Sequence, residues 1–65
     1  MQLIVNGDTL ELNGQTVSDL LNQLALQGRR LAVEVNQQII PKSQHPAHTL
    51  NEGDRVEIVH AIGGG

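Results

Sequence analysis

Apolar and polar residues follow two different periods along this chain. The strand-like runs are residues 3–5, 9–12, 31–35, 38–40 and 55–62. Residues 9–12 and 31–35 alternate with a period of two, which is typical of strands with one buried face. Asn6-Gly7 separates the first two runs, and this dipeptide strongly favours a two-residue hairpin turn. Asn36-Gln37 separates the next two runs, and Pro41 ends the fourth. The pattern therefore predicts five strands.

One stretch between the second and third strands has a helical period instead. Its apolar residues recur at positions i, i+3, i+4 and i+7, and they are Val17, Leu20, Leu21 and Leu24. Thr16 is a suitable N-cap, and Asp19 would lie near the positive end of the helix dipole. Gly28 is the predicted stop at the C-terminal end, with Arg29-Arg30 near the negative end of the dipole.

The resulting order is ββαβββ, which predicts an α+β domain with one helix packed on one face of a mixed, mostly antiparallel sheet. We expect residues 1–62 to form this domain and residues 63–65, all glycine, to form a flexible C-terminal tail. Residues 42–48 are predicted to be an irregular loop that Leu50 anchors to the core. Residues 51–54 are predicted to form a turn.

Composition restricts both the core and the chemistry. Hydrophobic residues make up 38% of the 65 positions but include no Phe, Tyr or Trp, so the core has to consist of Leu, Ile, Val and Ala. Since the chain has no Cys, it can form no disulfide, thiolate nucleophile or zinc-thiolate site. Any sulfur chemistry would need sulfur supplied from outside.

Charge and hydropathy argue against two classes of partner. The formal net charge is -3, and the four basic residues are scattered apart from the pair Arg29-Arg30, so nucleic-acid binding is not expected. No apolar run approaches the roughly 18 residues that a membrane span needs. Residues 1–7 lack the features of a signal peptide, so a cytoplasmic location is expected.

Side chains within the domain offer little chemistry. His45 and His48 have a spacing that could reach one metal, but no acid or Cys completes such a site, and a solvated loop is the favoured interpretation. His60 is expected at the edge of the core. Ser18 and Ser43 have no evident basic partner. We therefore expect no metal site and no self-contained enzyme.

A docking surface is predicted on the uncovered face of the sheet. Leu3 and Val5 would face the helix, so Ile4 would point outward, and Glu57 marks the solvent side of the last strand. If the first and last strands are neighbours, Ile4, Val59 and Ala61 would form an apolar patch, with Ile62 at the root of the tail. The patch predicts a partner-binding surface, although isolated exposed aliphatic residues are also ordinary in proteins.

The tail is the strongest candidate for chemistry. A carboxylate is a poor electrophile until it is activated, for example as an acyl-adenylate. An enzyme that activates a chain end has to pass the last residues through a narrow channel, where only side chains as small as those of Gly63, Gly64 and Gly65 would fit. The alternative is an ordinary unstructured chain end.

In its succession of motifs the chain resembles the ubiquitin-like sulfur carriers of thiamine biosynthesis. The matching segments are Asn6-Gly7, residues 16–21, residues 33–36, residues 40–42, Gly53-Asp54, residues 56–59 and the three final glycines. The resemblance covers essentially all 65 residues. It departs from the family pattern at His45, where similar sequences often carry Trp, so the packing of that loop is the open point.

The resemblance implies a β-grasp fold in which the first and last strands are parallel and central. It also implies a mechanism. A ubiquitin-activating-like adenylyltransferase would use ATP to adenylate the carboxylate of Gly65, and a persulfide donor charged by a cysteine desulfurase would convert it to a thiocarboxylate. Thiazole synthase would then accept the sulfur. The carrier itself would bind no cofactor and catalyse nothing, while Gly63 and Gly64 would thread the tail into partner active sites.

Three alternatives remain at this point. The small subunit of molybdopterin synthase has the same fold and terminal chemistry, but its chains are usually longer, with aromatic and proline residues before a double glycine. A ubiquitin-like modifier would join its end to lysine residues of target proteins. A plain interaction domain would be unaffected by loss of Gly64 and Gly65.

Overall fold

The computed structural model describes residues 1–60. The predicted last two residues of the final strand and the predicted glycine tail lie outside the described residues. The elements are β1 Gln2–Val5, β2 Asp8–Glu11, α1 Val17–Gln23, β3 Leu31–Val35, β4 Gln38–Ile40, the 3-10 helix η1 Lys42–Gln44 and β5 Arg55–His60. The sequence pattern therefore gave the correct order, and the bounds of β3 and β4 agree to the residue.

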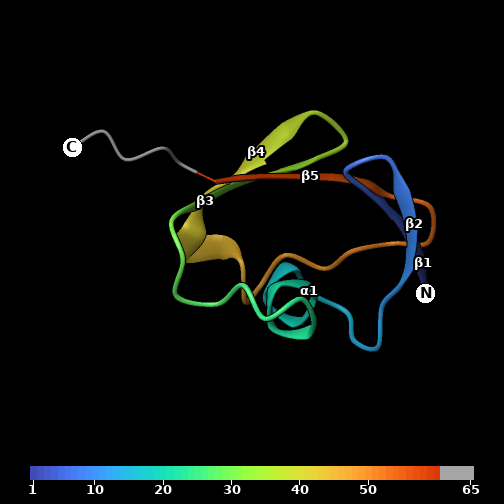
Figure 1. Cartoon of the computed structure of the whole chain (residues 1–65), viewed down its shortest axis with the longest axis horizontal. Coiled ribbons are helices and arrows are strands. Elements are labelled where there is room, and N and C mark those ends of the chain that lie inside the picture. Colours follow the sequence, from blue (N-terminus) through green and yellow to red (C-terminus); the bar gives the residue numbers. More distant parts are fainter. Residues whose placement is uncertain (61–65) are drawn as a thin grey trace.

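The strands form one five-stranded sheet in the order β2-β1-β5-β3-β4. β1 and β5 run parallel at its centre, while β1 pairs antiparallel with β2, and β3 pairs antiparallel with both β4 and β5. Figure 1 shows α1 and η1 on one side of β5. This arrangement is the β-grasp topology that the resemblance implied, and the prediction of a mixed sheet with one helix on one face is confirmed.

The two hairpins have the turns that their sequences predict. Asn6 and Gly7 have φ angles of 49° and 86°, and Asn36 and Gln37 have φ angles of 50° and 69°. Two successive left-handed residues match the right-handed twist of the flanking strands, and Asn tolerates this conformation better than most residues. Both turns therefore fix the register of their hairpins.

The start of α1 is held by a reciprocal cap. The Asp19 amide donates to Thr16 Oγ1 at 3.1 Å, and the Asp19 carboxylate accepts from the amides of Gln15 and Thr16 at 2.8 and 3.0 Å. A Cβ atom at Gly14 would lie 2.6 Å from that of Asp19, so this approach requires glycine. Hydrogen bonds from Gln15 and then Thr16 hold the pKa of the Asp19 carboxyl below its ordinary value of 3.8.

The cap predicts a pH-dependent effect of Asp19→Asn. A carboxyl with a lowered pKa in the folded state stabilises that state above its ordinary pKa, and this contribution is lost as pH falls through the lowered value. The variant should therefore melt below the parent chain at pH 7, and the difference should shrink on acidification below 3.8. Thermal melts at pH 7 and pH 3, with Asp8→Asn as the charge-matched control, test this. A difference that is equal at both pH values would contradict the prediction.

The predicted helix stop at Gly28 is wrong, because the helix ends earlier. Leu24 is the C-cap, and Ala25 has a φ angle of 58°. The amide of Leu26 donates to the carbonyl of Leu21 at 2.8 Å, and the amide of Ala25 donates to that of Asn22 at 3.1 Å. These two bonds form a Schellman motif with alanine at the position that glycine usually occupies. Leu24 and Leu26 pack against the core, so apolar contact fixes the end of the helix here.

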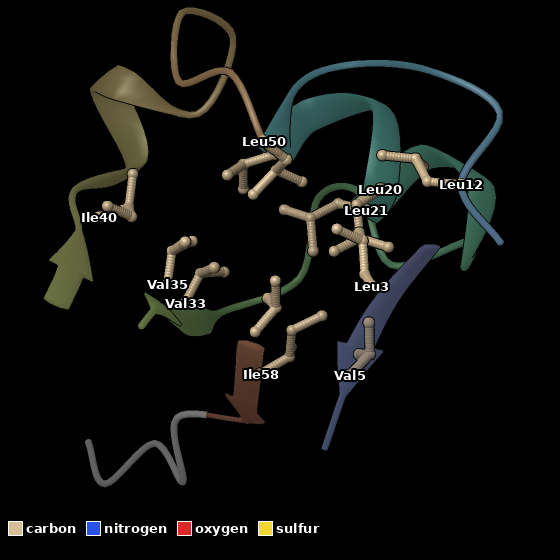
Figure 2. Close-up of a cluster of buried hydrophobic side chains, with 12 residues drawn as sticks. Leu3, Val5, Leu12, Leu20, Leu21, Val33, Val35, Ile40, Leu50 and Ile58 are labelled. Atoms are coloured by element: carbon tan, nitrogen blue, oxygen red, sulfur yellow. The ribbon is translucent and has the colours of Figure 1, made fainter. Parts of the chain in front are cut away.

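Side chains from the helix, the strands and the connecting loop form one aliphatic core (Figure 2). Its buried members are Leu3, Val5, Leu12, Val17, Leu20, Leu21, Val33, Val35, Ile40, Leu50, Val56 and Ile58. Leu50 is 1% exposed, which confirms that it anchors the loop before β5. Its amide donates to the Gln15 carbonyl at 2.7 Å, which ties this loop to the helix start. No helix in the described part of the chain is long and apolar enough to cross a membrane.

Candidate functional site

The face of the sheet opposite α1 carries the two large hydrophobic residues that are most exposed among residues 1–60. Val59 in β5 is 57% exposed and Ile39 in β4 is 67% exposed. Their neighbours Ile58 and Ile40 point into the core, and successive side chains of a strand alternate between the two faces. The prediction that Val59 faces outward is confirmed. The exposure of Ile39 was not predicted from the sequence. It follows from the inward direction of Ile40, since adjacent residues of a strand point to opposite faces.

Ile4 does not adjoin Val59, so the predicted continuous patch is not present. The parallel pairing of β1 and β5 places Ile4 opposite Arg55, four residues before Val59. At a rise of about 3.3 Å per residue, the two positions lie about 13 Å apart along the strand direction. Ile4 points away from the core, as predicted, but is only half-buried. The other predicted members, Ala61 and Ile62, lie outside the described residues, as do Gly63, Gly64 and Gly65.

The interpretation of residues 42–48 as an irregular solvated loop is wrong in two respects. Lys42–Gln44 form the 3-10 helix η1, and His45, which caps it, is 6% exposed. The imidazole Nε2 lies 3.0 Å from the carbonyl oxygen of Ile40, so Nε2 is the donor and His45 is satisfied within the fold. The polar pattern of residues 42–48 did not indicate this burial, because the acceptor is a backbone carbonyl at the end of β4.

The remaining polar candidates are not arranged for catalysis. His60, the last residue of β5, is exposed rather than at the edge of the core. His48 is half-buried and Ser43 is exposed. Ser18 and His45 line a surface pocket of about 300 Å³ together with Arg29 and Lys42. Within residues 1–60, no group of three or more His, Asp or Glu side chains is placed to hold a metal ion.

Asn6 holds the second half of β5, a contact that the sequence did not reveal. Its amide donates to the Val56 carbonyl at 2.9 Å. Its side chain then pairs with the backbone of Ile58, accepting from the amide at 2.8 Å and donating to the carbonyl at 3.2 Å. The side chain thus continues the pairing of β1 with β5 beyond the end of β1. Asn36 plays the equivalent part at the start of β5, where its Oδ1 accepts from the Arg55 amide at 3.0 Å.

These two asparagines provide a matched pair of variants. Asn6→Gly keeps the left-handed turn but removes both side-chain bonds to Ile58, so we expect a loss of about 1–2 kcal/mol and faster exchange of the Ile58 amide. Asn36→Gly should instead remove the hydrogen bond that the Arg55 amide donates, so exchange of that amide should become faster. Urea unfolding and amide hydrogen exchange by NMR measure both effects. Equal acceleration at Ile58 in the two variants would show that Asn6 does not hold this part of β5.

Comparison with known proteins identifies the family. The pattern of the ThiS family matches residues 3–65. The chain belongs to the ThiS family. It is 36% identical over 66 residues to the sulfur carrier protein ThiS of Escherichia coli (strain K12), and the match covers 100% of both chains. The crystal structure of the thiamine biosynthesis protein ThiS from Geobacter metallireducens superposes with a TM-score of 0.85 at 33% identity, again over 100% of both chains.

ThiS-like sequence also occurs inside larger proteins. The chain is 42% identical over 66 residues to a thiazole synthase of Paramagnetospirillum magneticum, and the match covers 100% of this chain. It spans only 20% of the length of that relative. A ThiS-like segment is therefore part of the same polypeptide as a thiazole synthase in that organism.

Proposed function

We propose that this ThiS-family chain carries sulfur for the thiazole ring of thiamine, with the carboxylate of Gly65 as the carrying group. The observation that carries the proposal is the full-length match to a sulfur carrier protein ThiS, which extends through the three final glycines. The β-grasp sheet and the ThiS-like segment within a thiazole synthase relative support the same function.

The proposed loading of Gly65 proceeds in three steps, and transfer of the sulfur follows. The Gly65 carboxylate attacks the α-phosphate of ATP on an activating enzyme related to ubiquitin-activating proteins, and pyrophosphate leaves. The outer sulfur of a persulfide, charged by a cysteine desulfurase, then attacks the acyl-adenylate and displaces AMP. A second thiol cleaves the resulting acyl disulfide, which leaves a thiocarboxylate at Gly65 and a disulfide on the donor. Thiazole synthase takes the sulfur from this thiocarboxylate.

In this proposal partner enzymes bind the domain and act on its tail, and the domain itself is not an enzyme. The histidine and serine side chains described above form no nucleophile and base pair, so activation falls to the partner enzymes. Gly63 and Gly64 add no side chains to the thread that enters each active site. Val59 with Ala61 and Ile62 gives partners a contact at the root of the tail, while Ile4 offers a separate contact at the other end of β5. The chain needs no bound cofactor, and the activating enzyme uses the ATP.

Intact-mass spectrometry tests the proposal. The chain is incubated with the activating enzyme, ATP and a persulfide donor, and we expect a gain equal to the exchange of one oxygen for sulfur at Gly65. Omission of ATP is the control, and no ATP-dependent gain with a competent enzyme would refute the proposal. Transfer to thiazole synthase, compared with molybdopterin synthase, then separates the two pathways. An isopeptide bond to lysine would indicate a protein modifier instead.

A further inference from the structure

Two glutamates face each other on the uncovered side of the sheet. Glu34 in β3 lies directly opposite Glu57 in β5 in the antiparallel register. Both point away from α1, because Val33, Val35, Val56 and Ile58 are the buried residues of these strands. Directly opposed residues have Cβ atoms roughly 5 Å apart. We call Glu34 and Glu57 the acidic pair.

The acidic pair has no positive partner within the described part of the chain. Like charges directly opposite each other destabilise a sheet. The ion pair found among residues 1–60 joins the amino group of Met1 to Glu11, at 2.9 Å. Arg55 lies two residues before Glu57 on the same face, yet it comes within 4.0 Å of neither carboxylate. Glu34 and Glu57 therefore place two carboxylates on one face without a cation of residues 1–60 within 4.0 Å, and a cation from outside could pair with both.

Apolar side chains lie on both sides of the acidic pair. Ile39 in β4 is opposite Glu34, so it forms the next position in the same row across the sheet. Val59 is opposite Ala32 in the row that follows, toward the end of β5. A single acidic pair thus lies between two exposed aliphatic side chains on a face that α1 and η1 leave free (Figure 1). A partner surface with one cation amid apolar residues matches this arrangement in both charge and polarity.

We propose that this face docks on thiazole synthase, with an arginine or lysine of that enzyme inserted between Glu34 and Glu57 and apolar residues against Ile39 and Val59. The inference rests on the proposed function for the identity of the partner. The relative from Paramagnetospirillum magneticum supports this choice, because a ThiS-like segment that shares a polypeptide with thiazole synthase is held close to it. A second copy of the chain is a poorer occupant, since it would bring two more carboxylates to the same face.

The test measures binding to thiazole synthase by calorimetry at low and high salt. Glu34→Gln/Glu57→Gln keeps the size of both side chains, and we expect at least about tenfold weaker binding, because the inserted cation loses its partners. The dependence of the affinity on salt should fall as well. Asp8→Asn is the control for loss of a single carboxylate elsewhere, next to the first turn, and it should bind within about twofold of the parent chain.

Sulfur loading of Gly65 by the activating enzyme provides the second readout. It should be unchanged in the double variant, which would also show that the variant is folded. Unchanged affinity for thiazole synthase, or equal losses in the double variant and Asp8→Asn, would overturn the inference. It would also be overturned if only the activating enzyme lost affinity, or if the variant changed self-association alone. Absence of sulfur loading in the parent chain would refute the proposed function instead. The binding measurement would still show whether thiazole synthase docks on this face.

Discussion

Deletion of Gly64 and Gly65 should abolish sulfur loading and leave the fold intact. The two residues span about 7 Å when extended, so the new terminal carboxylate would stop short of the α-phosphate of ATP in the activating enzyme. The buried cluster among residues 1–60 is formed by side chains from Leu3 to Ile58, so the free energy of unfolding should change by less than about 0.5 kcal/mol. Intact-mass spectrometry after incubation with ATP and the donor measures loading, and urea unfolding measures stability.

Deletion of Gly65 alone is the sharper control. Like the double deletion, it leaves a glycine carboxylate at the chain end, but it shortens the tail by only about 3.5 Å. Loss of loading in both deletions would show that the position of the carboxylate matters, and not merely its presence. Normal loading after removal of both glycines would contradict the assignment of the carrying group. A plain interaction domain would show no defect in partner function at all.

Much of the fold could be predicted because it depends on local patterns. The alternation in residues 31–35 predicted β3, and the short run of residues 38–40 before Pro41 predicted β4. The turn-forming pairs Asn6-Gly7 and Asn36-Gln37 predicted both hairpins. Thr16 and Asp19 gave the start of the helix. In each case a few neighbouring residues determine the local conformation, so the strand, turn or helix start can be predicted from the sequence alone.

The wrong predictions concern features that depend on tertiary contacts and not on the local sequence pattern. The helix ends at Gln23 and not near Gly28. Leu24 and Leu26 pack onto the core just after it, and this contact outweighs the preference for glycine at the end. His45 is buried and its Nε2 donates to the Ile40 carbonyl, a contact only five residues away that the polar pattern of residues 42–48 did not indicate. The separation of Ile4 from Val59 follows from the register of two strands about 50 residues apart in sequence. The acidic pair was missed for the same reason, since no local pattern places Glu34 opposite Glu57.

The largest effect on stability is expected from Leu20→Ala. Leu20 is 0% exposed and lies on the helix face that packs on the sheet (Figure 2). α1 has only seven residues, and helices this short are not stable without tertiary contacts. Removal of a buried leucine side chain costs about 2–5 kcal/mol, and the core of so small a domain supplies only about 3–5 kcal/mol of net stability.

We therefore expect a large fraction of Leu20→Ala to be unfolded at 37 °C, with the loss of stability visible by circular dichroism and urea unfolding. Ile39→Ala is the control, because it removes an aliphatic side chain that is 67% exposed, and its effect should stay within about 0.5 kcal/mol. A loss below about 1 kcal/mol for Leu20→Ala would mean that the helix is not the main cover of the sheet. The activating enzyme has to bind the folded domain before it can load the tail. The extent of loading of Leu20→Ala should therefore fall with its folded fraction as temperature rises. Loading of Ile39→Ala should equal that of the parent chain.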